Sequence, residues 1–147
     1  MILYWDTSAL IKRYVEEEGT RAVDRLWSAS TDRATSVVAF AETAAAFTRK
    51  FREGVLTEKE YAAALKTFKT DLDSFILIPI TAALNAEIER LVRRYPLRGF
   101  DAIHLSSALI FKGSKTIHVQ FACFDHVLNE AALKEGLAIA IQEEWEK

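Results

Sequence analysis

Cysteine is almost absent from this sequence, and long apolar runs are missing. The 147 residues include one cysteine, Cys123, which excludes an intramolecular disulfide and a zinc site built from several cysteines. Cys123 lies in an apolar stretch, so we expect a buried, inert thiol. No run of about 18 apolar residues occurs, and residues 1–6 carry no basic segment. We therefore expect a cytoplasmic protein without a membrane-spanning helix.

Proline and glycine are also scarce, and positive charge is not in excess. Two prolines and five glycines leave no flexible linker, so the length predicts a single domain over residues 1–147. Half of the residues are hydrophobic, which suffices for a core without disulfides or a structural metal. The net charge of −2 is unlike that of a general nucleic-acid-binding protein. It is compatible with a nuclease that holds metal ions with carboxylates.

Strand-like and helix-like segments alternate along the chain. The predicted strands cover residues 2–5, 35–38, 75–80, 117–124 and 138–141. The predicted helices cover residues 7–18, 21–29, 40–52, 57–73, 81–95, 101–111 and 126–133. Gly19 is expected to close the first helix, and Thr57 with Glu60 has capping-box spacing. This alternation predicts an α/β three-layer sandwich with a central, mainly parallel sheet flanked by helices.

Four acidic residues stand at informative places in this pattern. Asp6 and Asp125 directly follow predicted strands, Asp101 opens a predicted helix, and Glu42 lies near a helix start among alanines. Ligands of open parallel sheets bind at the carboxyl ends of the strands, so we predict that the four carboxylates meet there. No basic residue beside Asp6 or Glu42 offers a partner, and mutual repulsion would raise the pKa values. A divalent cation would resolve this conflict, although each acid alone could simply cap a helix.

Three segments resemble the motifs of PIN-domain ribonucleases, in particular VapC-type toxins. The segment from Asp6 to Tyr14 resembles the first motif, residues 98–108 resemble the third, and residues 124–137 resemble the last. Glu42 in Ala39-Phe40-Ala41-Glu42 matches the acid on the family's third helix. The segments follow one another in the family's order and span nearly the whole chain.

The resemblance implies a PIN-like fold and an Mg²⁺- or Mn²⁺-dependent endoribonuclease. Asp6 and Asp101 would be the main metal ligands, with Glu42 and Asp125 completing the acidic site directly or through water. Ser8 would place a hydroxyl near the metal or the scissile phosphate. A metal-activated water would attack phosphorus and leave 5′-phosphate and 3′-hydroxyl ends. The resemblance also implies an RNA substrate, a homodimer and inhibition by a VapB-like antitoxin.

Several other residues have two interpretations. His104 shares a helix face with Asp101, and we expect a packed, hydrogen-bonded histidine rather than a metal ligand. Trp5 is expected in the core, Trp145 at a partial surface, and the stripe Phe40, Phe47 and Phe51 in the core or a subunit interface. Three basic groups could contact RNA phosphates or simply face solvent: Lys12 and Arg13; Arg49, Lys50 and Arg52; and Arg93, Arg94 and Arg98.

Two other functions compete with the nuclease. A phosphatase could use Asp6 as a nucleophile, but the second acid that this chemistry needs two residues later is Ser8 here. A PIN-like domain could also bind RNA or protein with a dead site. Loss of an acid would be the mark of that second function, and all four acids are present.

Overall fold

A five-stranded parallel sheet forms the centre of the molecule. The computed structural model describes residues 1–113 and 118–142. The strands are β1 (Ile2–Trp5), β2 (Asp32–Ser36), β3 (Ile76–Ile78), β4 (Val119–Ala122) and β5 (Ala138–Ile139), in the order β3-β2-β1-β4-β5. Every neighbouring pair is parallel, with Ile2 beside Asp32 on one side and Val119 on the other. The prediction of a central parallel sheet is therefore confirmed.

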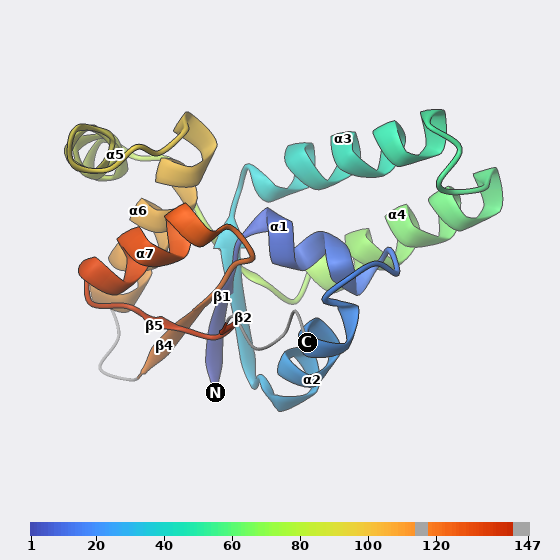
Figure 1. The fold of residues 1–147 in the computed structure, drawn as a ribbon, viewed down its shortest axis with the longest axis horizontal. Coiled ribbons are helices and arrows are strands. Elements are labelled where there is room, and N and C mark those ends of the chain that lie inside the picture. The colour runs from blue at the N-terminus through green and yellow to red at the C-terminus, as the bar shows by residue number, and fades with distance from the viewer. Residues whose placement is uncertain (114–117, 143–147) are drawn as a thin grey trace.

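Helices cover both faces of this sheet (Figure 1). One side carries α1 (Thr7–Leu10), the 3₁₀ helix η1 (Ile11–Arg13), α2 (Thr20–Ala29), α3 (Ala39–Arg52) and α4 (Glu58–Leu72). The other side carries α5 (Ala82–Arg94), α6 (Gly99–Gly113) and α7 (His126–Lys134). Helices α3 and α4 form a hairpin that extends away from the sheet. The three-layer α/β sandwich that the sequence predicts is the observed fold.

The residues of β1 alternate between the two helical layers. Ile2 and Tyr4 belong to the core beneath α5, α6 and α7, whereas Leu3 and Trp5 belong to the core beneath α1 to α4. Successive side chains of a strand point to opposite faces, and both faces of this strand are covered. A central strand in such a sheet therefore needs four consecutive apolar residues, and Trp5 is fully buried as predicted.

The prediction of the first helix is wrong in the length of the helix and in the residue that was expected to end it. Helix α1 continues only as a short 3₁₀ turn to Arg13, not to residue 18. The Thr20 hydroxyl donates to the carbonyls of Lys12 and Val15, so these carbonyls find a partner outside a continued helix. Gly19, with φ of +93°, precedes α2 as its N-cap residue and does not close the helix before it.

Most other boundaries shift by a few residues. Strand β2 begins three residues before the predicted start, and α6 begins at Gly99, so Asp101 lies in its first turn and does not open it. The capping box of α4 is confirmed, because Thr57 Oγ1 accepts from the Glu60 amide and Glu60 accepts from the Thr57 amide. The predicted strand residue 117 and Trp145 lie outside the described residues.

The buried and exposed side chains match the other expectations in part. Cys123 is buried, as expected. Phe47 is fully buried, but Phe40 and Phe51 are exposed at the surface and stack on Phe68 and Tyr61 of α4. Within the described residues, the helices are too short or too polar for any to cross a membrane.

Candidate active site

The carboxyl ends of β1 and β4 bring two of the predicted acids to one edge of the sheet. Asp6 follows β1, and its amide donates to the Ala122 carbonyl at the end of β4. The Asp6 carboxylate also caps α1 by accepting from the Ser8 amide at 3.2 Å. Asp125 caps α7 in the same way, by accepting from the Leu128 amide at 2.9 Å. Helix capping is therefore the local reason for both acids, and it aims them at the same edge.

Ser8 ties the two strand ends together. Its hydroxyl donates to Asp6 Oδ2 at 2.5 Å and accepts from the Phe124 amide at 3.1 Å. The thiol of Cys123 accepts from the Asp125 amide at 3.2 Å. Asp6 is only 5% exposed, so its hydrogen bonds from the Ser8 amide and hydroxyl replace much of the water that it would otherwise bind. Ser8 is thus a fixed part of the acidic edge.

Asp101 joins this edge from helix α6. Burial raises the pKa of the Asp101 carboxyl, and the negative charges of Asp6 and then Asp125 raise it further, against the opposing effect of Arg98. The carboxylates of Asp6 and Asp125, from distant parts of the chain, are therefore near enough to disfavour the charge of Asp101. Asp101 itself is half-buried, so part of the residue is accessible to solvent.

Glu42 has a partner that the sequence did not reveal. His104 Nε2 lies 2.6 Å from Glu42 Oε1 and 3.8 Å from Asp6 Oδ1. Burial raises the pKa of Glu42, but the hydrogen bond and charge of His104 outweigh it, so the pKa is lowered overall. The expectation that no basic group stands beside Asp6 or Glu42 is therefore wrong. Its physical reason is that α6 places His104, one turn beyond Asp101, against α3.

Two further side chains hold this histidine in place. The Tyr4 hydroxyl lies 2.9 Å from His104 Nδ1, and Thr7 Oγ1 lies 3.1 Å from His104 Nε2 while it donates to Glu42 Oε1 at 2.8 Å. His104 is 1% exposed, which confirms the expected packed and hydrogen-bonded histidine. Burial lowers the pKa of His104, but the carboxylates of Asp6 and Glu42 raise it above its ordinary value. Tyr4 and Thr7 carry no motif that would have identified them from the sequence.

The donor set fits a hard divalent cation that keeps part of its water shell. Nowhere in residues 1–113 and 118–142 do three Asp, Glu, His or Cys side chains stand ready to hold one ion together. Mg²⁺ commonly takes one or two carboxylates and completes its shell with water and substrate phosphates. Asp6 and Asp101 supply two carboxylates whose negative charges repel each other, and such a pair suits this kind of Mg²⁺ binding. Glu42 is engaged by His104 and Thr7, so it is suited to a contact through water.

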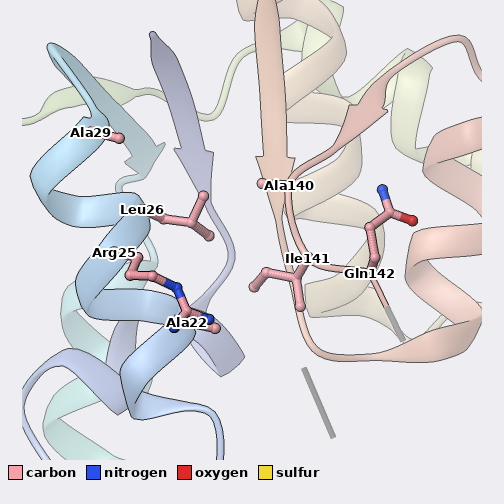
Figure 2. Close-up of a pocket in the computed structure, with 7 residues that line it drawn as sticks. All are labelled: Ala22, Arg25, Leu26, Ala29, Ala140, Ile141 and Gln142. Atoms are coloured by element: carbon pink, nitrogen blue, oxygen red, sulfur yellow. The ribbon is translucent and has the colours of Figure 1, made fainter. Parts of the chain in front are cut away.

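Another hollow in the surface lies away from these acids (Figure 2). It runs between α2 and the segment after β5, with Leu26 and Ile141 pointing into the space between them. Arg25 is its one charged side chain among the described lining residues, and the others are aliphatic apart from Gln142. The chemistry-bearing groups therefore gather at the carboxyl edge of the sheet and not in this hollow.

The fold and the site together define an α/β sandwich with an acidic centre at the carboxyl ends of its parallel strands. The family model for the PIN domain matches residues 3–133. Ribonuclease VapC45 of Mycobacterium tuberculosis is 32% identical over 139 residues, which cover 95% of this chain and 94% of that relative. The chain therefore belongs to the PIN-domain family, and its resemblance to VapC proteins is confirmed.

Solved structures agree with this fold. The M. tuberculosis toxin VapC20, described as cleaving the sarcin–ricin loop, superposes with a TM-score of 0.65 at 19% identity, over 95% of this chain and 98% of that chain. A toxin–antitoxin complex from Klebsiella pneumoniae gives a TM-score of 0.62 at 18% identity, over 84% and 86% of the two chains. At such low identity these likenesses establish the architecture alone.

Proposed function

We propose that this chain is a metal-dependent endoribonuclease and the toxin of a toxin–antitoxin pair. The observation that carries the proposal is that Asp6 and Asp125 follow adjoining strand ends tied together by Ser8, with Asp101 near enough that their charges add to the effect of burial in raising its pKa. A fold gains nothing in stability from such repulsion, so a ligand of opposite charge is the natural reason for it. The curated relative VapC45 is named a ribonuclease, which supports RNA as the substrate.

Each side chain has a role in this proposal. Asp6 and Asp101 would hold a Mg²⁺ or Mn²⁺ ion, with Asp125 beside them and Glu42 acting through water. A bound divalent ion supplies an acidified water and shields the negative phosphate. The Ser8 hydroxyl orients Asp6 and lies within reach of the same edge. Hydrolysis would join a water oxygen to phosphorus and break the P–O3′ bond, which leaves a 5′-phosphate and a 3′-hydroxyl.

Cleavage of single-stranded RNA in Mg²⁺ or Mn²⁺, compared with EDTA, tests the activity. We expect cleavage only with the ion, and Asp6→Asn or Asp101→Asn to lower its rate by at least ~10², as when one electrostatic contact at a reacting centre is lost. Asp73→Asn is the matched control, because this exposed acid ends α4 far from the sheet edge. Cleavage that persists in EDTA, or variants as fast as the unmodified chain, would refute the proposal.

We also propose a VapB-like antitoxin and a second copy of this chain as partners. The Klebsiella neighbour is a toxin–antitoxin complex, which supports the first partner. The edge strand β3 exposes Ile76 and Leu77, with Ile80 just beyond it, and an open apolar strand edge favours pairing with another chain. A particle of twice the 16.6 kDa chain mass in solution is the corresponding expectation.

A further inference from the structure

A groove leads away from the acidic edge between η1 and α3. Its lining includes Ser8 and Asp125 of the acidic edge together with Lys12, Glu17 and Lys50, and it also includes Arg49 and Glu53 of α3. The groove therefore shares two residues with the candidate active site and holds two lysines beside them. A nucleic-acid strand with its scissile phosphate at the acids would have its next phosphates within this groove or along the surface opposite it.

Glu17 lies between the two lysines. Its Oε1 is 3.2 Å from Lys12 Nζ, and its Oε2 is 3.0 Å from Lys50 Nζ. All three side chains are partly buried, with exposures of 29% for Glu17, 15% for Lys12 and 25% for Lys50. One carboxylate thus divides its two oxygens between two ammonium groups, which is also how a phosphodiester with two non-bridging oxygens would be bound.

The geometry of Lys12 is fixed by its surroundings. Its ammonium group donates to the Glu18 carbonyl at 2.7 Å and lies 4.8 Å from the centre of the Phe124 ring. The turn closes tightly on this pair, because a Cβ on Gly19 would lie 2.7 Å from the Phe124 ring and 3.1 Å from Lys12 Cδ. Lys12 is therefore held toward the groove whether or not Glu17 keeps its position.

We propose that Lys12 and Lys50 form a binding site for an RNA backbone phosphate next to the one that is cut, and that Glu17 occupies this site until RNA arrives. Lysine is a common phosphate ligand and acts as a point charge. Exchanging one carboxylate for one phosphodiester conserves the charge of the groove, so neither state leaves two lysines unpaired. The inference rests on the proposed function, because it takes RNA as the ligand.

Equilibrium binding without cleavage tests this site. The probe is a fluorescein-labelled 12-nucleotide RNA of mixed sequence, followed by anisotropy in EDTA over a series of salt concentrations. Glu17→Gln should tighten binding by about two- to fivefold, the range for releasing a partly exposed ion pair. Glu89→Gln is the matched control, because it makes the same charge change in the exposed Glu89–Arg93 pair on α5 and should leave affinity unchanged.

Substitution of either lysine should change RNA affinity in the opposite direction. Lys12→Gln and Lys50→Gln should each weaken binding and lower the slope of log affinity against log salt by about 0.7, the value for one lost phosphate contact to a single strand. Lys134→Gln, an exposed lysine at the far end of α7 from Asp125, should change neither. The urea midpoint of each variant shows that it is folded under the binding conditions.

The outcomes separate this inference from the proposed function. If RNA binding follows the expected pattern and cleavage depends on the metal, both the phosphate site and the nuclease proposal are supported. If RNA binding follows that pattern but no metal-dependent cleavage occurs, the phosphate site is supported and the nuclease proposal fails. If Glu17→Gln only lowers the urea midpoint and leaves RNA affinity unchanged, the ion pair is structural and the inference is wrong. The inference is equally wrong if the three substitutions change the affinity for a 12-residue poly-glutamate peptide and leave the affinity for RNA unchanged.

Discussion

His104 lets Glu42 keep its negative charge although its side chain is largely buried. An unpaired buried carboxylate is costly, and here the imidazole, with the Thr7 hydroxyl, takes over the contacts that water would make. The Tyr4 hydroxyl fixes the other ring nitrogen, so the ring has one orientation. Glu42 is thereby positioned relative to Asp6 before any ligand binds, which agrees with a role through water.

The same contact predicts how stability depends on pH. The folded pKa of His104 is raised above its ordinary value because Asp6, Glu42 and Asp101 outweigh burial, with Tyr4 uncharged beside it. Such a group stabilises the fold fully below its unfolded pKa and loses this contribution as pH rises through the folded pKa. The free energy of unfolding should therefore fall as pH rises from about 6.5, and His104→Gln, which keeps one donor, should lack this fall.

Urea unfolding in EDTA at several pH values measures the difference. His126→Gln is the control, because His126 is an exposed residue paired with Glu130 on the surface of α7. We expect the control and the unmodified chain to give parallel curves. If His104→Gln also runs parallel to them, His104 does not gain charge on folding and the electrostatic explanation is wrong.

At this scale the sequence predicts the acids better than their partners. Asp6 and Asp125 are predictable because each directly follows an apolar run of the sequence. His104 could be assigned to the face of Asp101 from helical spacing, but its contact with Glu42 joins α6 to α3 across the end of β1. No local pattern contains that contact, and Tyr4 appears in the sequence only as one of four core residues of β1.

The turn between η1 and α2 leaves no room for a side chain at Gly19. Gly19 has φ of +93°, and a Cβ there would lie 2.7 and 2.8 Å from two atoms of the Phe124 ring. Gly54, after α3, has φ of +79° with no atom within 4 Å of an added Cβ. The two glycines thus share a left-handed backbone and differ in the space around them.

Alanine at these two positions separates backbone strain from steric overlap. Gly54→Ala should lower the free energy of unfolding by about 1 kcal/mol, the cost of a left-handed conformation. Gly19→Ala should lower it by about 2–3 kcal/mol, because the Phe124 ring must also move. Urea unfolding of both variants provides the comparison. Equal losses would mean that the turn yields to the methyl group and that Phe124 is not tightly held.

Local signals predict this turn wrongly and other helix ends correctly. The run Glu16-Glu17-Glu18 has good helix propensity, which agrees with the predicted helix over residues 7–18 and not with the observed turn. The Thr20 hydroxyl, which pairs with carbonyls of the preceding turn, competes with the helix there. The Thr57–Glu60 box is a reciprocal local pair, so the sequence alone predicts it.

The strand order is the part of the whole molecule that the sequence could not provide. Alternating strands and helices predict a parallel sheet, but several orders satisfy short right-handed crossovers. The observed order places β1 between β2 and β4. This order places the strand ends that precede Asp6 and Asp125 next to each other, and the α6 helix packed near β2 carries Asp101 close to them. The convergence of the acids is therefore a property of topology.

This convergence makes the acidic edge a source of instability for the whole fold in the absence of a cation. A carboxyl whose folded pKa is raised, as at Asp101, destabilises the folded state at pH values above that pKa. Asp101→Asn should therefore raise the free energy of unfolding in EDTA by roughly 0.5 kcal/mol, the size of a like-charge contact between partly solvated groups. Thermal unfolding in EDTA at neutral pH measures this change.

Mg²⁺ should make the unmodified chain more stable than the Asp101→Asn variant, which is the reverse of their order in EDTA. A ligand that binds only the folded state at ten times its dissociation constant adds about 1.4 kcal/mol, or roughly 3–6 °C in midpoint for a chain of this size. The unmodified chain should gain this shift in Mg²⁺ and Asp101→Asn should not. Asp73→Asn should behave like the unmodified chain, since its carboxylate is outside the site. An Asp101→Asn midpoint that rises with Mg²⁺ as far as the unmodified one would mean that the ion binds elsewhere, and the repulsion at this edge would then need another cause.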